Sequence, residues 1–138
     1  MTVHGGLLRL ETQGHGQIVD ITDGVRGVLR TAEVDRGAAV VFVTGSTAAV
    51  TTMEYEPGGV HDLQALLERL IPARGEYEHN RLNGDTNAHA HLRASIVGPS
   101  ETIPVVDGRL VLGTWQQIVL VDFDDRPRTR TVTVHVIS

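Results

Sequence analysis

Thr129-Arg130-Thr131-Val132-Thr133-Val134-His135-Val136, close to the C-terminus, alternates polar and apolar residues from Thr131 onward. Such alternation places the apolar side chains on one face and is typical of a half-buried strand in an antiparallel sheet. Trp115–Phe123 forms a second strand-like stretch just upstream, and Asp124–Arg128 joins the two. The C-terminal third therefore predicts paired antiparallel strands.

A tight hairpin is predicted immediately before this pair. Asp107-Gly108 separates Ile103–Val106 from Arg109–Leu112, and an Asp-Gly dipeptide between two such runs favours a type I′ turn. Three further strands are predicted earlier in the chain. They are Val3–Glu11, interrupted by Gly5-Gly6, then Ala38–Thr44 and Ala48–Glu54.

Two segments predict helices, because their apolar residues recur three and four positions apart. The first apolar face consists of Ile21, Val25, Val28, Leu29 and Ala32. The second consists of Leu63, Leu66, Leu67, Leu70 and Ile71, and Pro72 ends it. Asp20 or Thr22 is a candidate N-cap of the first helix. The polar stretch 73–86 predicts a long loop. Strands with two or three helices, without βαβ alternation, indicate the α+β class in one domain, 1–138.

Composition excludes several classes of function. The 138 residues carry a net charge of −5 and no cysteine, so we expect no nucleic-acid partner and no thiolate metal site. A metal would need His, Asp, Glu or carbonyl ligands. No apolar run reaches the roughly 18 residues that span a bilayer, and the N-terminus lacks the pattern of a signal peptide. We therefore expect a cytoplasmic protein without a membrane partner.

The run Asn87-Ala88-His89-Ala90-His91-Leu92-Arg93 is the main candidate site. Imidazoles bind borderline divalent metals and titrate near neutral pH. In an extended segment His89 and His91 would share one face and could bind one ion, whereas on a helix they would point roughly 200° apart. A third ligand would come from His61, His79 or Glu54. The alternative is an ordinary pair of surface histidines.

Two further groups are candidates for binding an anion. Gly45-Ser46-Thr47 lies between two strands, where hydroxyls and free amides can hold a phosphate or carboxylate; the alternative is a polar turn or bulge. Arg126, Arg128 and Arg130 can bind phosphate oxygens, or can form a solvated group balanced by Asp122, Asp124 and Asp125.

Acidic residues near the end of the second central strand provide a further candidate. Glu54 and Glu56 lie at the end of the predicted apolar strand, a position suited to a metal ligand or a general base. Asp62, a few residues later, is an equally good candidate N-cap for the second helix.

Several of these segments, in order and with almost constant spacing from about residue 40, resemble the YjbQ-like family, whose members are often described as secondary thiamine-phosphate synthases. The matching segments are Ser46–Val50 leading to Glu54, His61–Leu63, Tyr77–His79, Asn87–Ser95, Gly98–Ser100, Ile103–Val105, Gly108–Leu110, Gly113–Gln116, and Arg128 with Arg130. The resemblance implies two packed antiparallel sheets with helices on them, a homotrimer, and a histidine-rich, metal-bearing pocket between subunits. His89, His91, His61 and His79 match the histidine positions of the family.

The chain departs from the family pattern at two positions. Many members have His-Thr-Ser where this chain has Gly45-Ser46-Thr47, and Asn where it has Met53. Losing that histidine removes a potential ligand and leaves a loop better suited to phosphate.

The resemblance implies an enzyme that joins a hydroxymethylpyrimidine diphosphate to a thiazole phosphate. In that hypothesis His89 and His91 bind a divalent metal with His61. Ser46, Thr47, Arg93 and Arg128 bind phosphates. His79 carries a proton, and Glu54 is a metal ligand or base. Histidine ligation suits zinc better than magnesium.

Two other hypotheses stay open from the sequence. The same ligands could serve a zinc-dependent hydrolase of unknown substrate, or a non-catalytic trimer that binds a metal or small anion.

Overall fold

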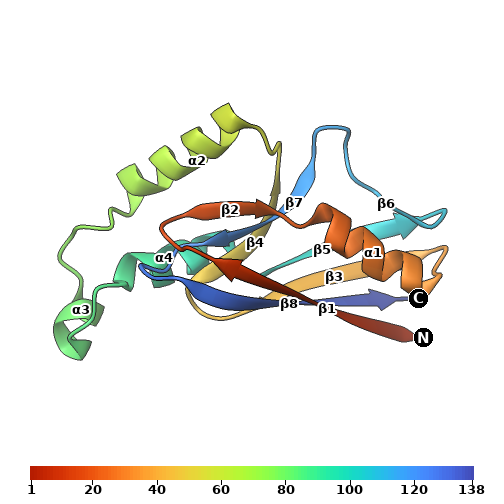
Figure 1. Ribbon diagram of the computed structural model, residues 1–138, viewed down its shortest axis with the longest axis horizontal. Coiled ribbons are helices and arrows are strands. Elements are labelled where there is room, and N and C mark those ends of the chain that lie inside the picture. The colour runs from red at the N-terminus through yellow and green to blue at the C-terminus, as the bar shows by residue number, and fades with distance from the viewer.

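The computed structural model describes residues 1–138 and contains eight strands and four helices (Figure 1). In chain order they are β1 (Val3–Thr12), β2 (Gln17–Asp20), α1 (Thr22–Ala32), β3 (Gly37–Thr44), β4 (Ala48–Met53), α2 (Pro57–Leu70), α3 (Glu78–Asn83), α4 (Ala88–Val97), β5 (Ser100–Val106), β6 (Arg109–Leu110), β7 (Gln117–Asp122) and β8 (Arg128–Ile137).

The strands form two antiparallel sheets, which confirms the predicted α+β class. The five-stranded sheet has the order β1-β8-β3-β5-β6 and the three-stranded sheet the order β2-β7-β4. The alternating strand β8 lies between β1 and β3, and Val132, Val134 and Val136 are fully buried on its inner face. Four helices are present where the sequence predicted two or three.

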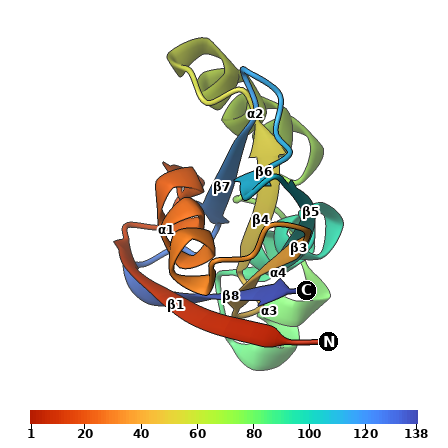
Figure 2. The ribbon, with the colours of Figure 1, turned by 90° about the vertical axis from the view of Figure 1, so that its right-hand side faces the viewer.

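Two hydrophobic clusters hold the fold together. The larger one gathers the inner faces of both sheets and the apolar face of α1, including Val25 and Leu29. The smaller one lies where α2 and α4 cover the three-stranded sheet, around Leu67, Ala90 and Phe123. Figures 1 and 2 show α1 at one end of the long axis and α3 with α4 at the other.

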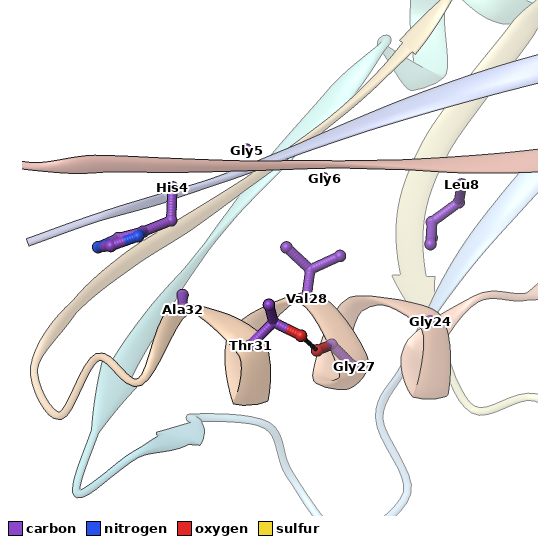
Figure 3. Close-up of a pocket in the computed structure, with 9 residues that line it drawn as sticks. All are labelled: His4, Gly5, Gly6, Leu8, Gly24, Gly27, Val28, Thr31 and Ala32. Atoms are coloured by element: carbon purple, nitrogen blue, oxygen red, sulfur yellow. Dashed lines mark hydrogen bonds between the residues drawn. The ribbon is translucent and has the colours of Figure 1, made fainter.

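The strand β1 continues through Gly5-Gly6, contrary to the predicted interruption, because both residues stay paired with β8. The glycines instead let α1 approach closely. A Cβ atom at Gly6 would lie 2.6 Å from Val28, and one at Gly24 would lie 2.8 Å from Leu8. Figure 3 shows Val28 pointing from α1 toward β1, beside a hollow of about 430 Å³.

Some element boundaries differ from the predictions. Strand β2 was not predicted, and β7 begins only at Gln117, which leaves Trp115 in a turn with 72% of its surface exposed. Helix α2 begins at Pro57, where Glu56 caps it by accepting from the Gly58 and Gly59 amides. The N-cap expected at Asp62 is therefore wrong, since proline at the first helical position and two free glycine amides start the helix earlier.

The middle of the chain is more helical than predicted. The supposed loop 73–86 contains α3, which Gly84 ends in the left-handed region at φ 61°. Residues 88–97 form α4. None of the helices is long and apolar enough to cross a membrane.

Candidate functional site

Helix α4 separates His89 from His91. His89 faces the protein interior and is 4% exposed, whereas His91 is half-buried. Positions i and i+2 of a helix point roughly 200° apart. The shared ion that an extended segment would have allowed is therefore not formed by these two residues of one chain.

His91 instead lies beside His79 of α3. Their ring centroids are 4.8 Å apart and the ring planes are tilted by 47°. Both rings line a pocket of about 290 Å³, together with Tyr77, Ala88 and Leu92 among others. The fold therefore brings two of the four predicted histidines together.

Asn80 fixes the protonation of the His79 ring. Its Oδ1 accepts from the Ala88 backbone N–H at 3.0 Å, which identifies this atom as the amide oxygen. The same Oδ1 lies 3.1 Å from Nδ1 of His79. Because an amide oxygen only accepts, Nδ1 must carry the proton. The Nε2 lone pair of His79 is then available to a metal or a proton.

The other proposed ligands lie elsewhere in the chain. His61 is exposed on α2, with its Nδ1 3.1 Å from Oδ1 of Asp62. Glu54 is exposed just after β4. No cluster of three His, Asp or Glu side chains within the chain is arranged to hold a metal ion. The histidine pair is at most part of a ligand set.

His89 is buried with an unpartnered Nδ1 atom. Burial lowers the pKa of His89, and the positive charge of Arg93 lowers it further. The ring is therefore neutral at pH 7 and faces the interior of the protein.

Arg93 ties α4 to the end of α2. Its Nε and Nη2 donate to the Ile71 carbonyl at 3.0 and 2.7 Å, and Nη2 also donates to Glu68 at 2.7 Å. The hydrogen bond from Arg93 lowers the pKa of Glu68. Most of the guanidinium is thus occupied, away from the Ser46 loop where a phosphate role was expected.

The Gly45–Thr47 loop is held in place by hydrogen bonds between Thr47 and buried charged residues. The Thr47 hydroxyl donates to Asp124 at 3.1 Å and accepts from Arg130 at 2.7 Å, while Ser46 is exposed. Gly45 has φ 141°, and a Cβ atom there would lie 2.7 Å from Nη1 of Arg130. Only glycine fits this backbone without strain.

A buried network of acids and arginines supports this loop, whereas the sequence left phosphate binding or a solvated group as the alternatives for these arginines. Arg130 donates to both carboxylate oxygens of Asp122, at 2.7 and 2.9 Å, and all three charged residues Asp122, Asp124 and Arg130 are buried. Burial by itself would raise the pKa of Asp122, but hydrogen bonds from Arg130 and Thr12 outweigh it and leave the pKa below its ordinary value.

Asp124 connects the network to the histidine helix. Its carboxylate accepts from Thr47, from Nε of Arg128 at 2.8 Å, and more weakly from Nδ2 of Asn87 at 3.4 Å. Burial would raise the pKa of Asp124, but its hydrogen bonds, first from the Asp125 backbone and then from Arg128, lower it. Thr47 and Arg128, both predicted as anion ligands, therefore both donate to the carboxylate of Asp124. Asn87, at the start of α4, donates to the same carboxylate.

Asn80 was not predicted from the sequence, and Asp122 and Asp124 were predicted only as charges that balance the arginines, without their burial. Nothing in the sequence distinguishes Asn80 from a loop asparagine, since its role depends on α3 and on the turn to α4. For Asp122 the available signal was its position directly after the apolar run 118–121. A residue at the end of a buried strand can itself be buried.

The fold and site define a small α+β protein with two antiparallel sheets and an imidazole pair over a surface pocket. A family model described as "UPF0047 protein YjbQ-like" matches residues 7–138. The chain therefore belongs to the YjbQ-like UPF0047 family, as the resemblance of its segments indicated.

Relatives and solved structures agree with this assignment. A UPF0047 protein of Archaeoglobus fulgidus is 41% identical over 130 residues, which cover 94% of this chain and 98% of the relative. A second UPF0047 protein, from Methanothermobacter thermautotrophicus, is 38% identical over 136 residues, which cover 99% of this chain and 93% of the relative. The crystal structure of a hypothetical protein from Aeropyrum pernix is 40% identical with a TM-score of 0.91, over 97% of this chain and 98% of that chain. None of these descriptions names an activity.

Proposed function

We propose that the protein binds a divalent metal through His79 and His91, and that the site acts on a phosphorylated small molecule. The observation that carries this proposal is the 4.8 Å separation of the two rings, together with the Asn80 hydrogen bond that occupies Nδ1 of His79 and leaves Nε2 as the nitrogen that can bind a metal. Two imidazoles this close together are suitable ligands for one ion.

Zinc is the metal we propose. Imidazole nitrogens are good ligands for zinc, whereas magnesium prefers carboxylates and water. The nearest side chains of the pocket include no carboxylate other than Glu78, which forms an ion pair with Arg81.

The missing ligand would come from a second copy of the chain. Helix α4 is apolar on both faces, because Ala90 and Ala94 are buried while Leu92 and Ile96 are 45% and 72% exposed. Leu82, on the neighbouring α3, is 71% exposed. Exposed apolar side chains gathered on one surface often mark a protein–protein contact, so the surface of Leu82, Leu92 and Ile96 suits an interface of the proposed homotrimer.

The substrate we propose is phosphorylated, as in thiamine-phosphate synthesis. In this proposal the Ser46 hydroxyl and the terminal nitrogens of Arg128 bind phosphate oxygens. Ser46 is exposed, and Arg128 uses only its Nε for Asp124, which supports this assignment. A bound divalent cation would supply positive charge against a leaving diphosphate.

Metal analysis tests the proposal directly. Protein purified without chelators is measured for zinc by mass spectrometry, beside His79→Ala, His91→Ala and His135→Ala. His135 is an exposed histidine on β8 and serves as the matched control. We expect zinc in the parent and in the control, and its loss in the other two. Zinc retained by both variants would overturn the proposal.

A second candidate function is hydrolysis. The same histidine pair suits a zinc-dependent hydrolase, which an assay of phosphatase and phosphodiesterase substrates would separate from thiamine phosphate formation. A protein that loses zinc through His91→Ala but has no turnover in either assay would be a metal-binding trimer without catalysis.

A further inference from the structure

Three arginines surround one pocket at the end of the molecule opposite to the histidine pair. The pocket has a volume of about 270 Å³ and is lined by Arg26, Leu29, Arg30, Gly108, Arg109 and Leu110. It lies between α1 and the β5–β6 hairpin, whereas α3 and α4 are at the other end (Figure 1).

The fold holds the three arginines on a rigid base. Arg26 and Arg30 are one turn apart on α1, so they share a face of the helix. Arg109 follows Asp107-Gly108, whose φ values of 52° and 70° are those of the predicted type I′ turn. The Gly108 N–H donates to the Asp35 carbonyl at 3.0 Å, which attaches the hairpin to the chain after α1.

The floor of the pocket is apolar and fixed. Leu29 is 4% exposed, and Leu110 packs against the same hydrophobic core. Core packing therefore fixes the backbone positions of the three arginines, and their side chains line the pocket.

No acidic side chain lines this pocket. The three deeply or partly buried arginines elsewhere, Arg93, Arg128 and Arg130, each pair with a carboxylate. Here only Arg26 has a partner, the almost fully exposed Asp23 at 3.2 Å, and such surface pairs contribute little.

The three positive charges repel one another when no anion lies between them. Two like charges at positions i and i+4 destabilise a helix, and Arg109 adds a third positive charge from the hairpin. A bound anion would reverse this repulsion, and guanidiniums bind phosphate oxygens through paired hydrogen bonds.

We infer that this pocket binds an oligophosphate anion of about the size of diphosphate. Three guanidiniums carry more positive charge than the roughly two negative charges of a single phosphate at pH 7 can balance, and the pocket volume of about 270 Å³ accommodates two linked phosphate groups. The site is separate from the proposed metal site and does not depend on it.

Titration with inorganic pyrophosphate in the presence of EDTA tests this inference, with affinity from calorimetry and position from backbone amide NMR shifts. We expect binding that weakens with added salt, with the largest shifts at Gly108, Leu110 and the last turn of α1. Arg30→Gln/Arg109→Gln should bind at least about tenfold more weakly, because it loses two charge-assisted donors.

The control variant is Arg69→Gln/Arg74→Gln, which removes the same charge from exposed arginines outside the pocket. It should bind like the parent protein. Equal weakening in both variants would mean a general effect of net charge and would overturn the inference. Three other outcomes would also overturn the inference: no binding at millimolar pyrophosphate, equal affinity for single phosphate, or chemical-shift changes centred on His91.

Discussion

His79 and His91 lie with their ring centroids 4.8 Å apart, at the junction of α3 and α4. The geometry depends on Asn80, whose Oδ1 joins the Ala88 amide to the His79 ring. The pair is thus fixed by the turn between two helices, and this turn is where the account is most easily tested.

Asn80→Ala should weaken zinc binding about 10- to 100-fold, the usual effect of losing a residue that orients a metal-binding histidine. Asn80→Asp keeps an oxygen acceptor for both donors and should retain most of the affinity. Competition with a fluorescent zinc chelator measures both variants. Equal loss of affinity in the two would argue against the orienting role of Oδ1.

Acid should destabilise the protein through Asp122. Its pKa is below the ordinary value of 3.8 in the folded chain, so the unfolded chain binds a proton first as pH falls. The contribution of Asp122 to the free energy of unfolding is then constant above about pH 5 and falls as pH drops through the unfolded and then the folded pKa.

Urea titrations at several pH values measure this slope. Asp122→Asn should be less stable by about 3–5 kcal/mol near neutral pH, because Arg130 is left buried without its charge partner. Its stability should also fall less steeply in acid. A slope identical to that of the parent would show that other carboxylates carry the pH dependence.

Gly45→Ala should destabilise the fold by about 1–3 kcal/mol, since it forces a side chain into a strained backbone region and toward Arg130. Gly27→Ala is the matched control. It lies inside α1 with only ordinary contacts for a new Cβ, and should stabilise by up to about 1 kcal/mol. Thermal unfolding distinguishes them, and shifts of the same sign would refute the structural explanation.

Ile96→Lys should dissociate the proposed trimer, because it places a charge on the exposed apolar face of α4. Light scattering after size exclusion gives the mass. Thr31→Lys, on an exposed position of α1, should leave the mass unchanged. A parent protein that is monomeric at micromolar concentration would contradict the proposed shared site.

The elements that sequence predicted well are those with a strong local pattern. The alternation near the C-terminus predicted β8, and Asp107-Gly108 predicted the turn between β5 and β6, with positive φ at both residues. Helix α4 lacked such a pattern, because Ala90 and Ala94 on one face and Leu92 and Ile96 on the other are all apolar. Helix α3 was missed because it is short and polar.

The candidate site was predictable only in part. His79 and His91 were both candidates, but their pairing depends on the turn between α3 and α4. The roles of Asp122 and Arg130 could not be predicted, since charged residues are rarely buried and their pairing is set by contacts between distant segments. Arg93 was assigned to phosphate, while most of its hydrogen bonds hold α4 to α2.

The central claim is that the two imidazoles share one metal ion. X-ray absorption spectroscopy at the zinc edge, on protein loaded with one equivalent of zinc, tests it most directly. The account predicts nitrogen scattering from at least two imidazoles, reduced by one in His79→Ala. An identical spectrum in that variant, or a shell of oxygen alone, would contradict it.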